Sequence, residues 1–141
     1  MTAEAHIIVN ELSMAYGDFV IQQDLNFTVN KEDIFILMGG SGCGKSTLLR
    51  HLVGLKHPAK GSVFYQDTNF WEASEQQRNE LMRHNGILYQ SGALWSAMTL
   101  AENIALPLAE YTDLSSAEIR ELVSLKLALV GLSGFEDYYP S

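Results

Sequence analysis

The alternation of apolar and polar positions predicts a strand-rich first half of the chain. Residues 6–14 read as a strand with a polar interruption at Asn10 and Glu11, and residues 25–29 (LNFTV) alternate as a half-buried strand does. The run IFILM at 34–38 is continuously apolar, which predicts a strand buried on both faces. Two further short strands are predicted, at residues 61–65 and 86–89.

Helical spacing predicts one helix among these strands, over residues 46–53, and predominates in the second half. There it predicts helices over residues 75–83 and 100–106, the last of which Pro107 should end or bend. Ser115 and Glu118 have the spacing of a capping box, so a helix is expected from there to about residue 130, with Gly131 or Gly134 as its left-handed cap. The pattern predicts an α/β fold, a mixed antiparallel and parallel sheet with a helical extension.

The stretch FILMGGSGCGKSTLLR, residues 35–50, contains the pattern G-x-x-x-x-G-K-[ST] between a predicted strand and a predicted helix. Glycines let several backbone N–H groups turn toward one point, where the positive end of the helix dipole also lies. Lys45 would neutralise phosphate charge, Ser46 would bind Mg²⁺, and Thr47 would contact phosphate. The expected phosphate-binding residues are Gly39, Gly40, Ser41, Gly42, Cys43, Gly44, Lys45, Ser46 and Thr47. The alternative is a glycine-rich turn that matches by chance, and Cys43 could instead be a reactive thiol.

Charge and composition narrow the choice of partners. The chain has 141 residues and a formal net charge of −8, from 9 basic and 17 acidic residues, so we expect no nucleic-acid partner. The single cysteine permits no internal disulfide. No signal peptide and no apolar run of roughly 18 residues is visible, so a membrane connection is expected through a partner.

Three stretches around the glycine-rich loop resemble the ATP-binding cassette (ABC) ATPases: LSMAYGDFVIQQDLNFTV, GILYQSGALWSAMTLAENIALPL and VGLSGFEDYYPS. The resemblance implies that Tyr16 stacks on adenine and that Gln90 of a Q-loop binds Mg²⁺ or orders the attacking water. Lys45 and Gln90 would then be the catalytic residues, with ATP and Mg²⁺ as cofactors. On their own, Tyr16 could be an ordinary packing residue at a strand end and Gln90 an ordinary surface residue.

The segment QSGALWSAMTLAENIALPLAEYTDLS is similar to that of the Mla-type phospholipid or toluene-tolerance cassettes. The resemblance implies a homodimeric ATPase subunit on the inner face of a bacterial membrane, which contacts a permease through the segment from Ser91 to Leu108. It implies an ATP-binding core over residues 1–90 and the start of a helical subdomain over 91–141. Gly40 departs from the usual proline and Tyr89 from the usual phenylalanine.

Two elements of a complete cassette have no counterpart in this sequence. No apolar strand ends in Asp–Glu, as a Walker B strand would, and Leu132–Ser133–Gly134 imitates only the first letters of the signature motif. The chain therefore resembles the N-terminal part of a cassette, and we expect this part alone to be inactive in hydrolysis, with an open sheet edge and poor solubility. A soluble non-transport ABC ATPase, or a regulatory nucleotide-binding module without hydrolysis, remain alternatives.

Overall fold

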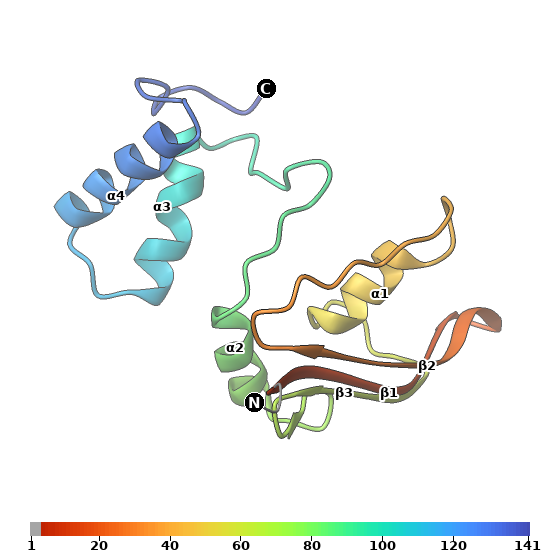
Figure 1. The fold of residues 1–141 in the computed structure, drawn as a ribbon. Helices are drawn as coiled ribbons and strands as arrows, with labels where there is room; N and C mark the ends of the chain where they lie inside the picture. Colours follow the sequence, from red (N-terminus) through yellow and green to blue (C-terminus); the bar gives the residue numbers. More distant parts are fainter. Residues whose placement is uncertain (1–3) are drawn as a thin grey trace. The chain divides into compact units, whose positions relative to one another are not determined.

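The computed structural model describes residues 4–141, which form two compact units, one ending at Asn85 and the other beginning at Gly86 (Figure 1). The first unit holds a four-stranded sheet in the order β2-β1-β3-β4, and every pair of strands is antiparallel. Its elements are β1 (Ala5–Tyr16), β2 (Phe19–Asn30), α1 (Lys45–Leu52), β3 (Lys60–Tyr65), β4 (Thr68–Asn69) and α2 (Glu75–Arg83). The second unit holds α3 (Leu100–Tyr111) and α4 (Ser116–Leu129).

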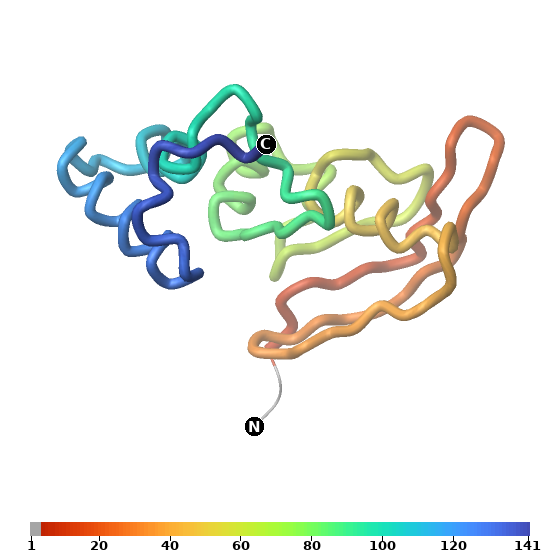
Figure 2. The backbone as a smooth tube through the Cα atoms, turned by 90° about the horizontal axis from the view of Figure 1, so that it is seen from above, coloured from red at the N-terminus to blue at the C-terminus, as the bar shows by residue number. Residues whose placement is uncertain are grey.

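The polar interruption predicted in the first strand is a β-bulge. The register of β1 with β2 shifts between Val9 and Leu12, and Glu11 takes a positive φ of 47°. The Glu11 N–H donates to Oδ1 of Asn26 across the hairpin, at 2.9 Å. Figure 2 follows this long hairpin, from red to orange, to its turn and back. The strands predicted at 6–14 and 25–29 are confirmed, and both extend further toward the turn.

The bulge decides which side chains of β1 enter the core. Without an extra residue, a strand would place positions 9, 11 and 13 on one face. With it, Val9, Leu12 and Met14 share a face and are buried. They pack with the buried residues of α1, β3 and the segment after β4, namely Leu48, Val63, Tyr65 and Phe70.

The strands predicted at residues 34–38 and 86–89 are wrong. Both stretches run without regular secondary structure, and the run IFILM is largely exposed, with Ile34 at 92% of its full accessibility. A strand needs a neighbour that pairs with its backbone, and no described residue between 4 and 141 does so for either stretch. The α/β class holds, but the parallel pairing predicted for the sheet is absent from the part of the chain that the structure describes.

The predicted helices form, with one difference at Pro107. Helix α3 continues through Pro107 to Tyr111 instead of ending there. Proline has a fixed φ that suits a helix, and only its own N–H bond, to the carbonyl of Asn103, is lost. Helix α4 begins with the predicted capping box, and Gly131 ends it in a Schellman motif, in which Leu132 N donates to Leu127 O. The two helices lie side by side (Figures 1 and 2).

A histidine side chain lies in the core of the first unit. His51 of α1 is fully buried, and its Nδ1 lies 2.5 Å from the carbonyl oxygen of Lys56. Because a carbonyl only accepts, Nδ1 carries the hydrogen, and Nε2 is buried without a partner among the described residues. Burial disfavours the charged ring and lowers the pKa of His51 below its ordinary value.

This burial predicts a loss of stability in acid. As the pH falls below about 6.5, the unfolded chain takes up a proton on His51 that the folded chain does not. The free energy of unfolding should therefore fall, by at most about 1.4 kcal/mol for each pH unit, until the folded pKa is reached. Urea unfolding between pH 5 and pH 8 measures this slope. It should be shallower in His51→Gln than in His84→Gln, which removes an exposed imidazole; equal slopes would contradict the prediction.

Candidate functional site

The glycine-rich loop joins residue 38 to the first turn of α1. Gly42 and Gly44 both have a positive φ, 79° and 103° respectively, a conformation that other residues rarely adopt. At Gly44 a Cβ would also lie 2.8 Å from Cγ2 of Ile21. Backbone conformation and space therefore both require glycine at this position, which is the N-cap of α1.

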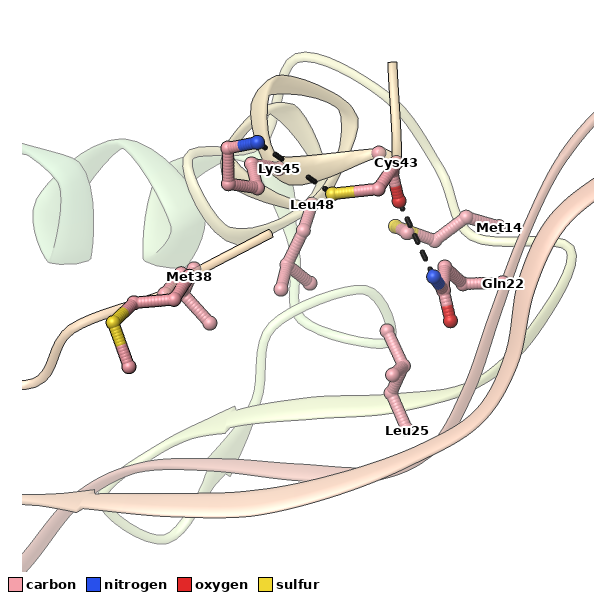
Figure 3. Close-up of a pocket in the computed structure, with 9 residues that line it drawn as sticks. Met14, Gln22, Leu25, Met38, Cys43, Lys45 and Leu48 are labelled. Carbon is pink, nitrogen blue, oxygen red and sulfur yellow. Dashed lines mark hydrogen bonds between the residues drawn. The ribbon is translucent and has the colours of Figure 1, made fainter. Parts of the chain in front are cut away.

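Lys45 folds back over the loop that precedes it. Its Nζ donates to the carbonyl oxygens of Gly39 and Gly40, each at 2.7 Å, and lies 3.5 Å from Sγ of Cys43 (Figure 3). No carboxylate of residues 4–141 is within ion-pair distance of this ammonium. The loop therefore closes around a positive charge that no acidic side chain neutralises.

The N-terminus of α1 differs from those of the other three helices. Helices α2, α3 and α4 each begin with a complete capping box, formed by Ser74–Gln77, Thr99–Glu102 and Ser115–Glu118. Helix α1 has no side-chain cap and no acidic residue in its first turn. Its first N–H groups stay without the side-chain acceptors that the other helices provide, so the positive end of the helix is open to an anion.

Two hydroxyls lie in the first turn of α1. Ser46 is exposed, and its side chain makes no hydrogen bond within the described residues, so it is free to bind a cation or a phosphate oxygen. Thr47 is half-buried. No cluster of three or more His, Cys, Asp or Glu suited to a metal ion occurs in the described range 4–141. A magnesium ion here would need the Ser46 hydroxyl and oxygens from a bound phosphate.

Tyr16 lies at the end of β1, beside this helix. A hydrogen bond with the Thr47 side chain lowers the pKa of Tyr16 below its ordinary value, and the positive charges of Lys56 and Arg50 act in the same direction. Nζ of Lys56 lies over the Tyr16 ring, 2.9 Å from its centroid. The structure thus brings Tyr16 and the first turn of α1 together, as the predicted site requires.

Gln22 contacts the glycine-rich loop, which the sequence alone does not predict. Its Nε2 donates to the carbonyl of Cys43 at 3.2 Å and so ties β2 to the middle of the loop (Figure 3). Below the loop lies a cavity of about 130 Å³ with mostly apolar walls. It is lined by Met14, Gln22, Leu25, Leu37, Met38, Cys43, Gly44, Lys45 and Leu48. Its small volume and mostly apolar walls do not suit a polyphosphate, so a phosphate would have to bind to the loop outside this cavity.

Gln90 belongs to the second unit. It is exposed in a turn, where Gly92 N donates to Tyr89 O at 3.2 Å. Its predicted part in metal binding and catalysis stays a prediction. The segment that follows exposes large apolar side chains, Leu94 and Trp95 among them, with Trp95 at 66% of its full accessibility. None of the helices in the described residues has the length and apolar character needed to cross a bilayer.

Comparison with known proteins shows the family of the chain. The family model described as "ABC transporter" matches residues 22–139. The "Probable ribonucleotide transport ATP-binding protein mkl" of Mycobacterium bovis is 40% identical over 95% of this chain and 37% of its own length. The "Intermembrane phospholipid transport system ATP-binding protein MlaF" of Haemophilus influenzae is 37% identical over 96% of this chain and 51% of its own. The chain thus spans between about a third and a half of these relatives.

A solved structure supports the fold. The ATP-binding cassette MJ0796, described as a dimer in a post-hydrolysis state bound to ADP and Pi, superimposes with a TM-score of 0.84. The match covers 95% of this chain and 61% of that one, at 23% identity, which is evidence for the fold alone. The family model matches residues 22–139, so the chain belongs to the ABC transporter family, as its glycine-rich loop and Q-loop segment predict.

Proposed function

We propose that the loop from Gly39 to Thr47 binds the phosphates of ATP. The observation that carries this proposal is the coincidence of an uncapped helix N-terminus with the unneutralised ammonium of Lys45. Backbone N–H groups between Ser41 and Ser46 would surround the β- and γ-phosphates. Gly42 and Gly44 hold the conformation that makes this possible.

Lys45 changes partners when phosphate binds. In the present structure its ammonium hydrogen-bonds two carbonyls of its own loop. A phosphate oxygen is a charged acceptor and makes a stronger bond than a neutral carbonyl does. We infer that Lys45 turns at least one N–H bond toward the nucleotide and keeps the others on the loop. Magnesium, which Ser46 and Gln90 are predicted to bind, would neutralise part of the phosphate charge.

Tyr16 would supply the base contact. The residue is 47% exposed and lies beside the first turn of α1, which the phosphates would occupy. A flat aromatic face stacks on any purine, so it contributes affinity more than selectivity. Tyr16 and the loop belong to one compact unit, so both contacts can be made by the same nucleotide.

For the complete protein we propose the ATP-hydrolysing subunit of a bacterial ABC transporter. Residues 1–90 would form the N-terminal part of its ATP-binding core, and residues 91–141 the start of its helical subdomain. Two copies would act as a dimer on the inner face of the membrane, with the segment from Ser91 to Leu108 against the permease. The similarity of this segment to the lipid-transporting cassettes, together with the relative MlaF, favours phospholipid or another hydrophobic substrate.

Removal of the Lys45 ammonium should abolish most nucleotide binding. A charge-assisted hydrogen bond contributes about 1.5 to 3 kcal/mol, so Lys45→Ala in the complete protein should weaken ATP binding by about ten- to a hundredfold. Isothermal titration with Mg-ATP measures this. Lys126→Ala removes an exposed lysine of α4 and is the matched control; equal affinities of the two variants would exclude the loop as the binding site.

Tyr16 should contribute to nucleotide affinity only through its contact with the base. Stacking contributes about 1 kcal/mol or somewhat more, so Tyr16→Leu should weaken ATP binding about five- to tenfold. Binding of inorganic tripolyphosphate, which has no base, should not change, and Tyr16→Phe should retain most of the ATP affinity. If Tyr16→Leu weakened ATP and tripolyphosphate equally, the residue would act on the loop and the base contact would be refuted.

Trp95 should matter for the permease and not for ATP. A carboxylate in place of its exposed indole cannot enter an apolar interface without a large desolvation cost. Trp95→Glu in the complete protein should therefore reduce permease-stimulated ATP turnover at least about tenfold at unchanged ATP affinity. Leu129→Glu changes another exposed apolar residue of the same unit and should have little effect. Lost ATP affinity in Trp95→Glu would contradict the assignment.

A further inference from the structure

One side chain holds the turn that precedes α3. Oδ1 of Asn103 accepts from the backbone N–H of Trp95 at 2.7 Å. Its Nδ2 donates to the carbonyl oxygens of Trp95, Met98 and Thr99, at 3.0, 3.1 and 2.9 Å. Asn103 therefore binds both backbone polar groups of Trp95 and closes the turn from the inside.

Two further sets of hydrogen bonds stabilise this turn and the start of α3. Met98 N donates to Trp95 O at 3.1 Å, and the capping box of Thr99 and Glu102 fixes the start of α3 directly after it. Asn103 is the fourth residue of α3, where its short side chain can reach back past the helix start. Asparagine is unfavourable in a helix interior unless local hydrogen bonds compensate, and here they do.

The chemistry of the contact selects an amide. The site needs one acceptor and two N–H donors on a short side chain, and asparagine alone provides this set. Aspartate has the same size and could accept from Trp95, but its carboxylate would face three carbonyl oxygens. Alanine would leave all of these groups to water or unpaired.

The residue held by this turn is exposed. The backbone of Trp95 is held by hydrogen bonds, while the residue is 66% exposed and Leu94 beside it is also exposed. Tryptophan is among the residues that contribute most at protein interfaces, and a contact residue held rigidly before binding loses less entropy on association. A fixed backbone under an exposed indole is the arrangement expected of a preorganised contact.

We propose that Asn103 is a positioning residue for permease binding, which fixes the Trp95 turn before the two proteins meet. The inference rests on the proposed function, in which the segment from Ser91 to Leu108 faces the permease. Asn103 touches neither nucleotide nor permease; it acts through Trp95. Its loss loosens the turn and weakens the association, while nucleotide binding in the first unit is untouched.

The test uses the complete protein with the variants Asn103→Ala and Asn103→Asp. Asn79→Ala, an exposed asparagine of α2, is the matched control. Hydrogen exchange followed by mass spectrometry should show faster exchange of the peptide containing Trp95 and Met98 in both Asn103 variants only. Inside-out membrane vesicles that carry the permease, stripped of their own ATPase, are then titrated into each protein. The vesicle concentration for half-maximal stimulation of ATP turnover should rise about tenfold, with the maximum unchanged.

A change in the vesicle concentration for half-maximal stimulation, at unchanged maximal turnover, distinguishes a positioning role from a general structural one. A variant that merely folds poorly would lose ATP affinity and maximal turnover together, which would overturn the proposal. Unchanged exchange around Trp95, or faster exchange with unchanged half-maximal stimulation, would overturn it as well. Trp95→Glu distinguishes the proposals: if it uncouples the permease while Asn103→Ala does not, the docking segment stands and the role of Asn103 fails. If Trp95→Glu has no effect, the docking segment itself is refuted.

Discussion

The site depends on a positive charge that the protein leaves without an acidic partner. The chain carries 17 acidic residues against 9 basic ones, yet none of the described carboxylates pairs with Lys45. An ammonium satisfied only by carbonyl oxygens is hydrogen-bonded but not neutralised, so the loop keeps a favourable potential for an anion. The missing cap on α1 adds to it, because a Ser or Asp at position 44 would occupy the N–H groups that a phosphate needs.

The acidic residues elsewhere in the chain limit where an anionic ligand can bind. A net charge of −8 repels polyanions over most of the surface, so a nucleotide is attracted only where local positive groups dominate. Lys45, Arg50 and Lys56 gather around the first turns of α1 and Tyr16. The proposed nucleotide site and the expected lack of a nucleic-acid partner would both follow from this uneven distribution of charge.

Features formed by residues close together in the sequence are predicted better than contacts between distant residues. The capping box of Ser115 and Glu118, the glycine that ends α4 and the loop around Lys45 all involve residues a few positions apart, so their chemistry is visible in the sequence. The sequence indicates the bulge at Glu11 only as a polar interruption. The contacts of Gln22 with Cys43, and of Lys56 with Tyr16, join residues from different parts of the chain. No rule based on sequence spacing predicts them. The continuous apolar run at 34–38 predicts a strand, but an apolar run cannot supply the partner strand with which its backbone would pair.

That unpaired run limits how firmly the loop is held on its entry side. Residues after the loop are anchored by α1, and the middle is anchored by Gln22. Residues 34–38 have no hydrogen-bonded partner strand in the part that the structure describes, although Phe35 stacks on Phe27 of β2. Leu37 and Met38 reach the cavity under the loop, so the apolar packing there is incomplete on that side. Each loop residue that must be ordered when phosphate binds costs about 1 to 2 kcal/mol of backbone entropy. Any element that paired with 34–38 would fix the entry to the loop in advance and so strengthen phosphate binding without touching the phosphate.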